Sequence, residues 1–276
     1  MSTRVESPMP GYPRNRLTDR SNADPVVRRT TLSRGYAISY EDAGAGPVIL
    51  LIPGSTMSAA DWRDAGYLDH LVGTHRVISV DPLGNGLSDK PHDPDAYGWP
   101  DVAADLVAVL DAAGVERAVA WGYSRGGALA AALAADFPDR VSGVILHDGG
   151  PEPVAKGSAP SANSEAMFRG DMSPIWTAYS FSDDDRRYDE EFNDIQALGA
   201  MAIGERRSGV AVDLGQVSAP ALVLAGSRDG PETATRDAEA LGAELQILPD
   251  LDHLEAFSRL DLVMPAISAF LGSHGI

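Results

Sequence analysis

Cysteine is absent from this chain of 276 residues. Its absence excludes disulfide bonds, thiolate nucleophiles, and the zinc or iron–sulfur sites that cysteine ligates. A metal site would then depend on histidine, and none of the six histidines has partner ligands at a spacing usable for zinc. We therefore expect neither a bound metal nor any other cofactor.

Basic residues are scarce. Lys and Arg number 22 against 40 Asp and Glu, which gives a net charge of −18 at neutral pH. Such a protein is repelled by the phosphate backbone of nucleic acids and by anionic membrane surfaces. The expected partner is therefore a small-molecule substrate, with no nucleic acid and no membrane.

Long hydrophobic runs are also missing. No stretch approaches the roughly 20 apolar residues that span a bilayer, and the first residues contain no apolar run of signal-peptide length. We expect a cytoplasmic protein. Residues 1–26 are rich in Pro, Arg, Asn and Ser and show no periodicity, so they are predicted to form a flexible N-terminal arm.

Short apolar runs alternate with helical patterns along most of the remaining chain. A predicted hairpin over residues 27–44 is followed by runs typical of buried strands, at 47–53, 75–81, 117–122, 140–147, 221–226 and 243–248. This alternation predicts an α/β fold with a mostly parallel sheet, helices on both faces and right-handed crossovers. Residues 27–150 and 216–276 are assigned to this core.

The alternation stops over residues 151–215. This segment has Pro- and Ser-rich stretches, an acidic cluster around residues 183–191, and a helical pattern through Phe192, Ile195, Leu198 and Met201. Acidic residues are favourable at the start of a helix, so the cluster is predicted to begin one. The segment is predicted to be a small helical cap inserted into the core.

A serine motif follows one of the predicted strands. Gly122-Tyr123-Ser124-Arg125-Gly126 matches G-x-S-x-G between a strand and a helix, the context in which the pattern indicates a nucleophilic serine. The turn must be tight to expose the hydroxyl, and glycines permit that. The alternative is a Gly-rich strand-to-helix turn without chemistry, because short motifs also occur by chance.

Such a serine requires a base and an acid. His253 comes after the last predicted strand and before the final helix, although a surface histidine could also lie there. Asp229 follows the penultimate strand, where its carboxylate could accept the Nδ1 proton of the histidine. Asp148 also ends a strand and stays a rival acid.

Together these motifs resemble those of the α/β-hydrolase superfamily, in its serine-nucleophile branch of esterases and lactonases, over about residues 28–276. The elbow motif, the order Ser…Asp…His and the loop at residues 81–88 carry the resemblance. It implies the α/β-hydrolase sheet and a triad of Ser124 as nucleophile, Asp229 as acid and His253 as base. It also implies an oxyanion hole made by the backbone N–H groups of Ser55 and Arg125.

One departure concerns the oxyanion loop, because many relatives have His-Gly after the third strand and this chain has Pro53-Gly54-Ser55. A second is Arg125, where many relatives have a small or apolar residue. We expect its guanidinium to pair with Asp148, and the alternative is that it meets a polar group of the substrate. The predicted substrate pocket comprises Trp62, Tyr123, Asp148, Phe168, Trp176 and Tyr179.

A serine nucleophile disfavours the dehalogenase and epoxide hydrolase branches, which use a carboxylate, and favours acyl transfer. The sequence therefore predicts hydrolysis of a carboxylic ester or lactone of a small, largely apolar substrate through an acyl-enzyme. A cofactor-free haloperoxidase or perhydrolase, or a C–C bond hydrolase, would use the same triad. A non-catalytic ligand receptor on the same fold is a further alternative.

Overall fold

The computed structural model describes residues 26–179, 181–209 and 212–276. Its centre is an eight-stranded sheet in the order β1-β2-β4-β3-β5-β6-β7-β8. β1 and β2 are antiparallel, as are β2 and β4, and all other neighbours are parallel. The strands are β1 Val27–Ser33, β2 Tyr36–Gly44, β3 Val48–Ile52, β4 Arg76–Val80, β5 Ala118–Tyr123, β6 Val141–His147, β7 Ala221–Gly226 and β8 Glu244–Leu248.

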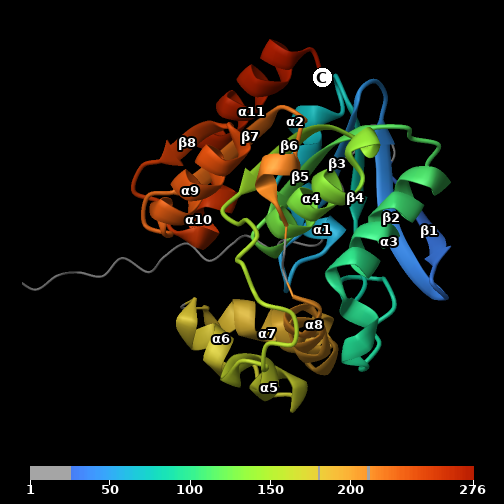
Figure 1. Cartoon of the computed structure of the whole chain (residues 1–276), viewed down its shortest axis with the longest axis vertical. Coiled ribbons are helices and arrows are strands. Elements are labelled where there is room, and N and C mark those ends of the chain that lie inside the picture. Colours follow the sequence, from blue (N-terminus) through green and yellow to red (C-terminus); the bar gives the residue numbers. More distant parts are fainter. Residues whose placement is uncertain (1–25, 180, 210–211) are drawn as a thin grey trace, which may run out of the picture.

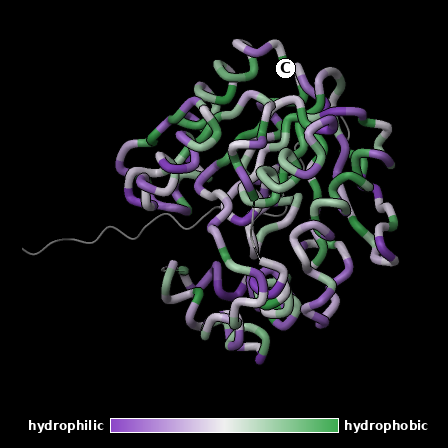
Figure 2. The backbone as a smooth tube through the Cα atoms, in the orientation of Figure 1, coloured by the Kyte–Doolittle hydropathy of each residue, from purple (hydrophilic) through white to green (hydrophobic). Residues whose placement is uncertain are grey.

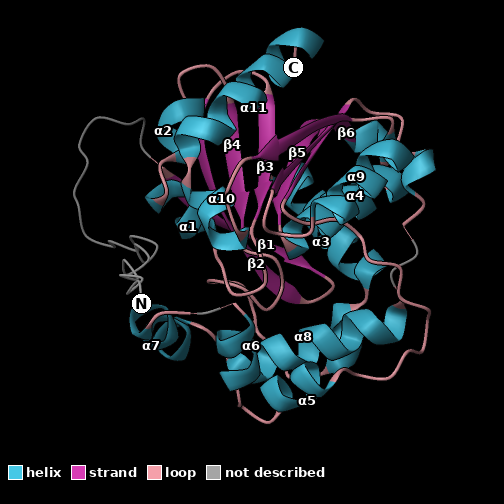
Figure 3. Ribbon diagram, turned by 90° about the vertical axis from the view of Figure 1, so that its left-hand side faces the viewer, coloured by secondary structure: helices cyan, strands magenta, loops and turns pink. Residues whose placement is uncertain are grey.

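Helices cover both faces of this sheet (Figure 3). One face is covered by α3 (Trp99–Ala112), α4 (Arg125–Asp136) and α9 (Pro231–Leu241). The other is covered by α1 (Ala59–Asp64), α2 (Tyr67–Leu71), α10 (His253–Ser258) and α11 (Leu260–His274). Short 3₁₀ helices lie at Pro94–Tyr97, Pro138–Arg140 and Leu214–Gln216.

The two faces explain why the inner strands are apolar throughout. Along β3, Leu50 and Ile52 enter one hydrophobic cluster while Ile49 and Leu51 enter the other. Successive side chains of a strand point to opposite faces, so a strand buried on both sides has no polar alternation. Figure 2 shows hydrophobic segments in the middle of the sheet and hydrophilic ones at the periphery.

Four helices that lie between β6 and β7 in the sequence form a separate layer outside the sheet. They are α5 (Ala162–Phe168), α6 (Ser173–Ala178), α7 (Asp183–Phe192) and α8 (Ile195–Ser208), and they lie together beside the core in Figure 1. All four lie within the segment where the cap was expected. The acidic cluster begins α7, where Ser182 and Asp185 form a reciprocal capping box.

The predicted strands and helices are present, and the α/β fold class is confirmed. One difference is that the helical segment after β3 is broken into α1 and α2, because Gly66 adopts a left-handed conformation with φ of 96°. The predicted N-terminal arm lies almost wholly outside the described residues. Among the residues that are described, no helix is long and apolar enough to cross a membrane.

Candidate active site

Ser124 lies at the sharp turn between β5 and α4. Its backbone has φ 55° and ψ −123°, an uncommon conformation for a residue with a side chain. A Cβ atom at Gly122 would lie 1.8 Å from the Gly126 carbonyl oxygen, and one at Gly126 would lie 2.1 Å from the Ile52 carbonyl oxygen. Both glycines are therefore required for the turn that presents the serine hydroxyl.

Gly122→Ala should lower the free energy of unfolding by about 3 kcal/mol or more, because the added methyl meets backbone atoms that cannot move aside. Gly272→Ala is the matched control. It lies in α11 with nothing within 4 Å of the added Cβ, so we expect it to be neutral or slightly stabilising. Denaturant unfolding measures both, and equal stability of the two variants would contradict this description of the turn.

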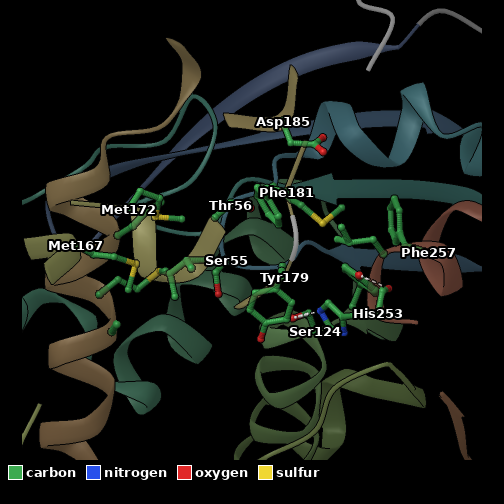
Figure 4. Close-up of a pocket in the computed structure, with 18 of the residues that line it drawn as sticks. Ser55, Thr56, Ser124, Met167, Met172, Tyr179, Phe181, Asp185, His253 and Phe257 are labelled. Atoms are coloured by element: carbon green, nitrogen blue, oxygen red, sulfur yellow. Dashed lines mark hydrogen bonds between the residues drawn. The ribbon is translucent and has the colours of Figure 1, made fainter. Parts of the chain in front are cut away.

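Ser124, His253 and Asp229 form a continuous hydrogen-bonded chain. His253 Nδ1 lies 2.5 Å from Asp229 Oδ2, and its Nε2 lies 3.0 Å from Ser124 Oγ. With Nδ1 donating to the carboxylate, Nε2 is left to accept the serine proton. Figure 4 shows the Ser124 and His253 side chains facing each other. The structure thus brings together the three residues that the sequence singled out.

His253 is also held through its backbone. It is the first residue of α10, and its carbonyl oxygen accepts a 2.7 Å hydrogen bond from the Tyr123 hydroxyl. The Tyr123 ring lies against the imidazole at a centroid distance of 5.1 Å. Tyr123, which precedes Ser124, therefore ties the position of His253 to that of Ser124.

Asp148 does not occupy the position of the acid. Its Oδ1 accepts a 2.8 Å hydrogen bond from the Gly226 N–H group, and its side chain is fully buried. Burial, together with the nearby Asp229 charge, raises the pKa of this carboxyl to about 7, although the Gly226 N–H group and His253 oppose the shift. The bond to His253 Nδ1 belongs to Asp229.

The expected pairing of Arg125 with Asp148 is wrong. The Arg125 guanidinium instead lies 2.6 Å from Glu205 on α8, and both side chains are nearly inaccessible to solvent. Burial raises the pKa of Glu205, and the guanidinium opposes that shift. The partner lies in the cap, 80 residues further along the chain, where no local pattern links it to the elbow. The pair joins the cap to the residue that follows Ser124.

The loop at residues 53–57, where the oxyanion hole was predicted, is held by hydrogen bonds that the sequence did not reveal. Asn85 is fully buried, and its side-chain amide donates to the carbonyl oxygens of Ser55 and Met57, both at 2.8 Å, and of Gly54 at 3.2 Å. Asp81 accepts the backbone N–H of Ala59 at 2.6 Å. The loop at residues 81–88 contributed to the family resemblance. Its sequence alone does not show which backbone carbonyl groups the Asn85 side chain would reach.

A cavity of about 190 Å³ opens beside Ser124 and His253, between the core and the cap. It is lined mostly by apolar side chains, shown in part in Figure 4: Met57, Met167, Met172, Ile175, Phe181, Leu198, Met201 and Phe257. Ser55 lies at its rim with Ser124. Methionines dominate the walls, and their flexible thioethers adapt to irregular ligands.

Only part of the predicted pocket lines this cavity. Tyr123 and Tyr179 do, whereas Asp148 lines a second, more polar cavity on the Asp229 side. Trp62 was placed wrongly, because it is fully buried in the core against Tyr67, Trp121 and Phe257.

Two further aromatic residues of the cap were also placed wrongly. The Trp176 indole donates to Asp189 at 2.9 Å inside the cap, and Phe168 packs against the main hydrophobic cluster. Neither is among the residues that line the cavity.

One group of side chains could in principle hold a metal. In the described part of the chain, only Asp148, Asp229 and His253 form a cluster of three such residues, with ligand atoms within 4.8 Å of one another. Two of them are already hydrogen bonded to each other through Nδ1 and Oδ2. A metal at this position would displace the proton that His253 donates to Asp229.

Comparison with known families supports the fold. A family model described as the alpha/beta hydrolase fold matches residues 47–174. The chain is 34% identical over 129 residues to a 2-hydroxy-6-oxo-2,4-heptadienoate hydrolase of Pseudomonas putida, covering 46% of each protein. It is 37% identical over 126 residues to a 2-hydroxymuconate semialdehyde hydrolase of a Pseudomonas species, covering 44% of this chain and 43% of the relative. The chain thus spans less than half the length of the curated relatives it matches.

Solved structures extend the likeness to nearly the whole chain. The enol-lactonase from Burkholderia xenovorans superposes with a TM-score of 0.74 at 22% identity, covering 88% of this chain and all of that one. Est816, described as an N-acyl homoserine lactone degrading enzyme, superposes with a TM-score of 0.72 at 25% identity and the same coverage.

The segment matched by the family model contains β3 to β6 and the turn at Ser124. The other four strands, β1, β2, β7 and β8, belong to the same eight-stranded sheet. The two curated relatives described above are named hydrolases. From the sheet, the turn and these matches we conclude that the chain has the alpha/beta hydrolase fold.

Proposed function

We propose that this protein is a serine hydrolase that cleaves a carboxylic ester or lactone of a small, largely apolar substrate through an acyl-enzyme. The observation that carries the proposal is the hydrogen-bonded chain from Asp229 through His253 to Ser124, which ends at an apolar cavity. A serine in such a chain is activated for attack on a carbonyl carbon.

In this proposal His253 Nε2 takes the hydroxyl proton while Ser124 Oγ bonds to the carbonyl carbon. The N–H groups of Ser55 and Arg125 would stabilise the resulting oxyanion, and Asp229 would stabilise the imidazolium. When the ester C–O bond breaks, His253 returns the proton to the leaving alkoxide. A water molecule then attacks the acyl-enzyme by the same route, so that the ester and water yield an acid and an alcohol.

The cavity limits the size of the acyl group. Its volume of about 190 Å³ is below the ~300–1,000 Å³ of pockets that enclose drug-sized ligands. Its apolar walls favour hydrocarbon over charged acyl chains. We therefore infer a short or medium acyl chain, or a small lactone ring.

A series of 4-nitrophenyl esters of increasing acyl length, with small lactones beside it, tests this function. We expect kcat/KM to fall by about 100-fold or more once the acyl chain exceeds the cavity. Met201→Ala, which removes a buried side chain from the wall, should move the optimum to longer chains. Equal activity on all chain lengths would contradict an acyl-binding role for the cavity.

A C–C bond hydrolase is the second candidate, because two of the relatives are named as hydrolases of dienoate and semialdehyde compounds. The two functions differ in the bond that breaks next to the carbonyl. Turnover of a 2-hydroxy-6-oxo-dienoate, measured as loss of its absorbance, with no turnover of esters would favour this candidate.

Chelators should leave the activity unchanged, because a serine, a histidine and two backbone donors supply all the proton transfers and charge stabilisation of the proposed route. The measurement is kcat for an ester before and after prolonged dialysis against EDTA. A loss of activity that zinc or calcium restores would overturn the proposed mechanism.

A further inference from the structure

Asp148 is held rigidly at the carboxyl end of the sheet. Its backbone N–H donates to the Leu224 carbonyl at 2.8 Å, and its Oδ1 accepts from the Gly226 N–H at 2.8 Å, so both bonds lead to β7. Its φ of 46° is in the left-handed region, which is uncommon for a non-glycine residue, although Asp adopts it more readily than most. The carboxyl group therefore has one defined position.

The second oxygen of this carboxyl, Oδ2, is buried and receives no hydrogen bond from any described residue. A buried carboxylate oxygen without a donor is unfavourable, because it has lost its hydrogen bonds to water and gained none in the protein. Carboxyl oxygens of Asp148 and Asp229 lie within 4.8 Å of each other and of a His253 ring nitrogen. A second acid therefore lies close to the Asp148 carboxyl, and two ionised acids repel each other.

The neighbouring histidine and tyrosine supply no positive charge. His147 Nε2 is 3.9 Å from Asp148 Oδ2, but burial lowers the His147 pKa to about 3, so the ring is neutral. Its Nε2 lies 3.3 Å from the Ala256 carbonyl oxygen. Burial raises the pKa of Tyr67, which stays a neutral phenol.

Groups from the other surrounding elements do not supply a positive charge to the Asp148 carboxyl either. The Arg125 side chain is directed to Glu205 in the cap. Glu152 and Asp237 line the polar cavity beside Asp148, and both are acids. Tyr179 lines it from the cap, and burial raises its pKa as well. Among the described residues around Asp148, the remaining candidate cation is the His253 imidazolium, which is bonded to Asp229.

A hydrogen bond can join two acids only if one of them carries a proton. We propose that Asp148 carries this proton in the resting enzyme and donates it from Oδ2 to the Asp229 carboxylate, so that a carboxyl–carboxylate pair, rather than Asp229 alone, orients His253. The raised pKa of Asp148, caused first by burial, agrees with this position of the proton. The inference rests on the proposed function, in which His253 is the base.

The pair makes Asp148 a positioning residue. Asp229 is in a loop, and its side chain is about 30% exposed, so a bond from the rigid Asp148 would restrict its orientation. Loss of the Asp148 proton at higher pH would place a second negative charge beside His253. That charge would stabilise the imidazolium and raise the pKa of His253, which would make the base less available near neutral pH.

Two substitutions of Asp148 distinguish the effect of its titratable proton from the effect of its hydrogen-bond donor. Asp148→Asn keeps a donor of the same shape and is neutral at every pH, whereas Asp148→Ala removes the donor. We expect the Asn variant to keep the plateau kcat/KM for an ester within about threefold, with its acid limb shifted to lower pH by about 1 unit. The Ala variant should lose about tenfold or more in kcat.

Asp237→Asn is the matched control. Asp237 is also buried and lines the same cavity, but its carboxylate is bonded to Arg236 at 2.7 Å. We expect no shift of the acid limb in this variant. An unshifted acid limb in Asp148→Asn, or equal losses in the Asn and Ala variants at every pH, would overturn the proposal.

Infrared difference spectroscopy detects a protonated Asp148 carboxyl directly, without a measurement of enzyme turnover. The wild-type spectrum at pH 6 minus that at pH 9 should contain the C=O band of a protonated carboxyl, and this band should be missing in Asp148→Asn. Its presence in both proteins would place the proton elsewhere. A protein that hydrolyses no ester but shows the band would contradict the proposed function and leave the carboxyl pair standing.

Discussion

Ser124→Ala is expected to lower kcat by about 10⁶ while the protein stays folded. No other nucleophile can replace the hydroxyl, because the Ser124 Oγ is the group hydrogen bonded to His253 Nε2 at the mouth of the cavity. The alanine removes only one oxygen atom from a partly exposed side chain, so the fold should tolerate it. Ester hydrolysis and thermal unfolding measured on the same preparation separate the two effects.

Ser273→Ala is the control for this substitution. Ser273 lies in α11, and its hydroxyl donates only to the Phe270 carbonyl one turn earlier. We expect its kcat to equal that of the wild type. If Ser124→Ala keeps a tenth of the wild-type activity, Ser124 is not the nucleophile.

Asp229→Asn is expected to lower kcat by about 10⁴. An amide at this position can donate to His253 Nδ1, which forces the proton onto Nε2 and prevents that nitrogen from accepting the serine proton. The affinity for substrate should change little, since the cavity is lined by other residues. Steady-state kinetics give kcat and KM separately.

Asp250→Asn is the matched control, because Asp250 is exposed, lies three residues before His253, and has a φ of 57° that asparagine tolerates. We expect its kcat to stay within about twofold. Asp148→Asn gives the decisive comparison. A loss of about 10⁴ in Asp148→Asn together with a mild effect in Asp229→Asn would make Asp148 the acid.

The positions of Ser124, Asp229 and His253 could be predicted because each follows a strand of a parallel sheet. The carboxyl ends of such strands meet at one edge, so residues far apart in the sequence converge there. The order of the motifs along the chain therefore predicted a contact between side chains that are 129 residues apart. The prediction of contacts between distant residues was possible because parallel strands all end at the same edge of the sheet.

The environment of these residues could not be predicted in the same way. Trp62 is in a helix of six residues, too short for its periodicity to show which side faces the core. The cavity walls depend on how α5 to α8 are rotated against the core. Met172 and Met201 line the cavity, whereas Phe168 and Trp176, which were expected there, do not. The Arg125–Glu205 pair and the contacts of Asn85 depend on the same tertiary packing.

Mass spectrometry of the intact protein, quenched during turnover of a slowly hydrolysed ester, tests the acyl-enzyme at Ser124 most directly. The predicted result is an added mass equal to the acyl group, mapped to the peptide that contains Ser124, lost on further incubation and absent in Ser124→Ala. A fluorophosphonate probe should label the same residue. Turnover of the ester with no adduct, or an adduct on any other residue, would contradict the proposed mechanism.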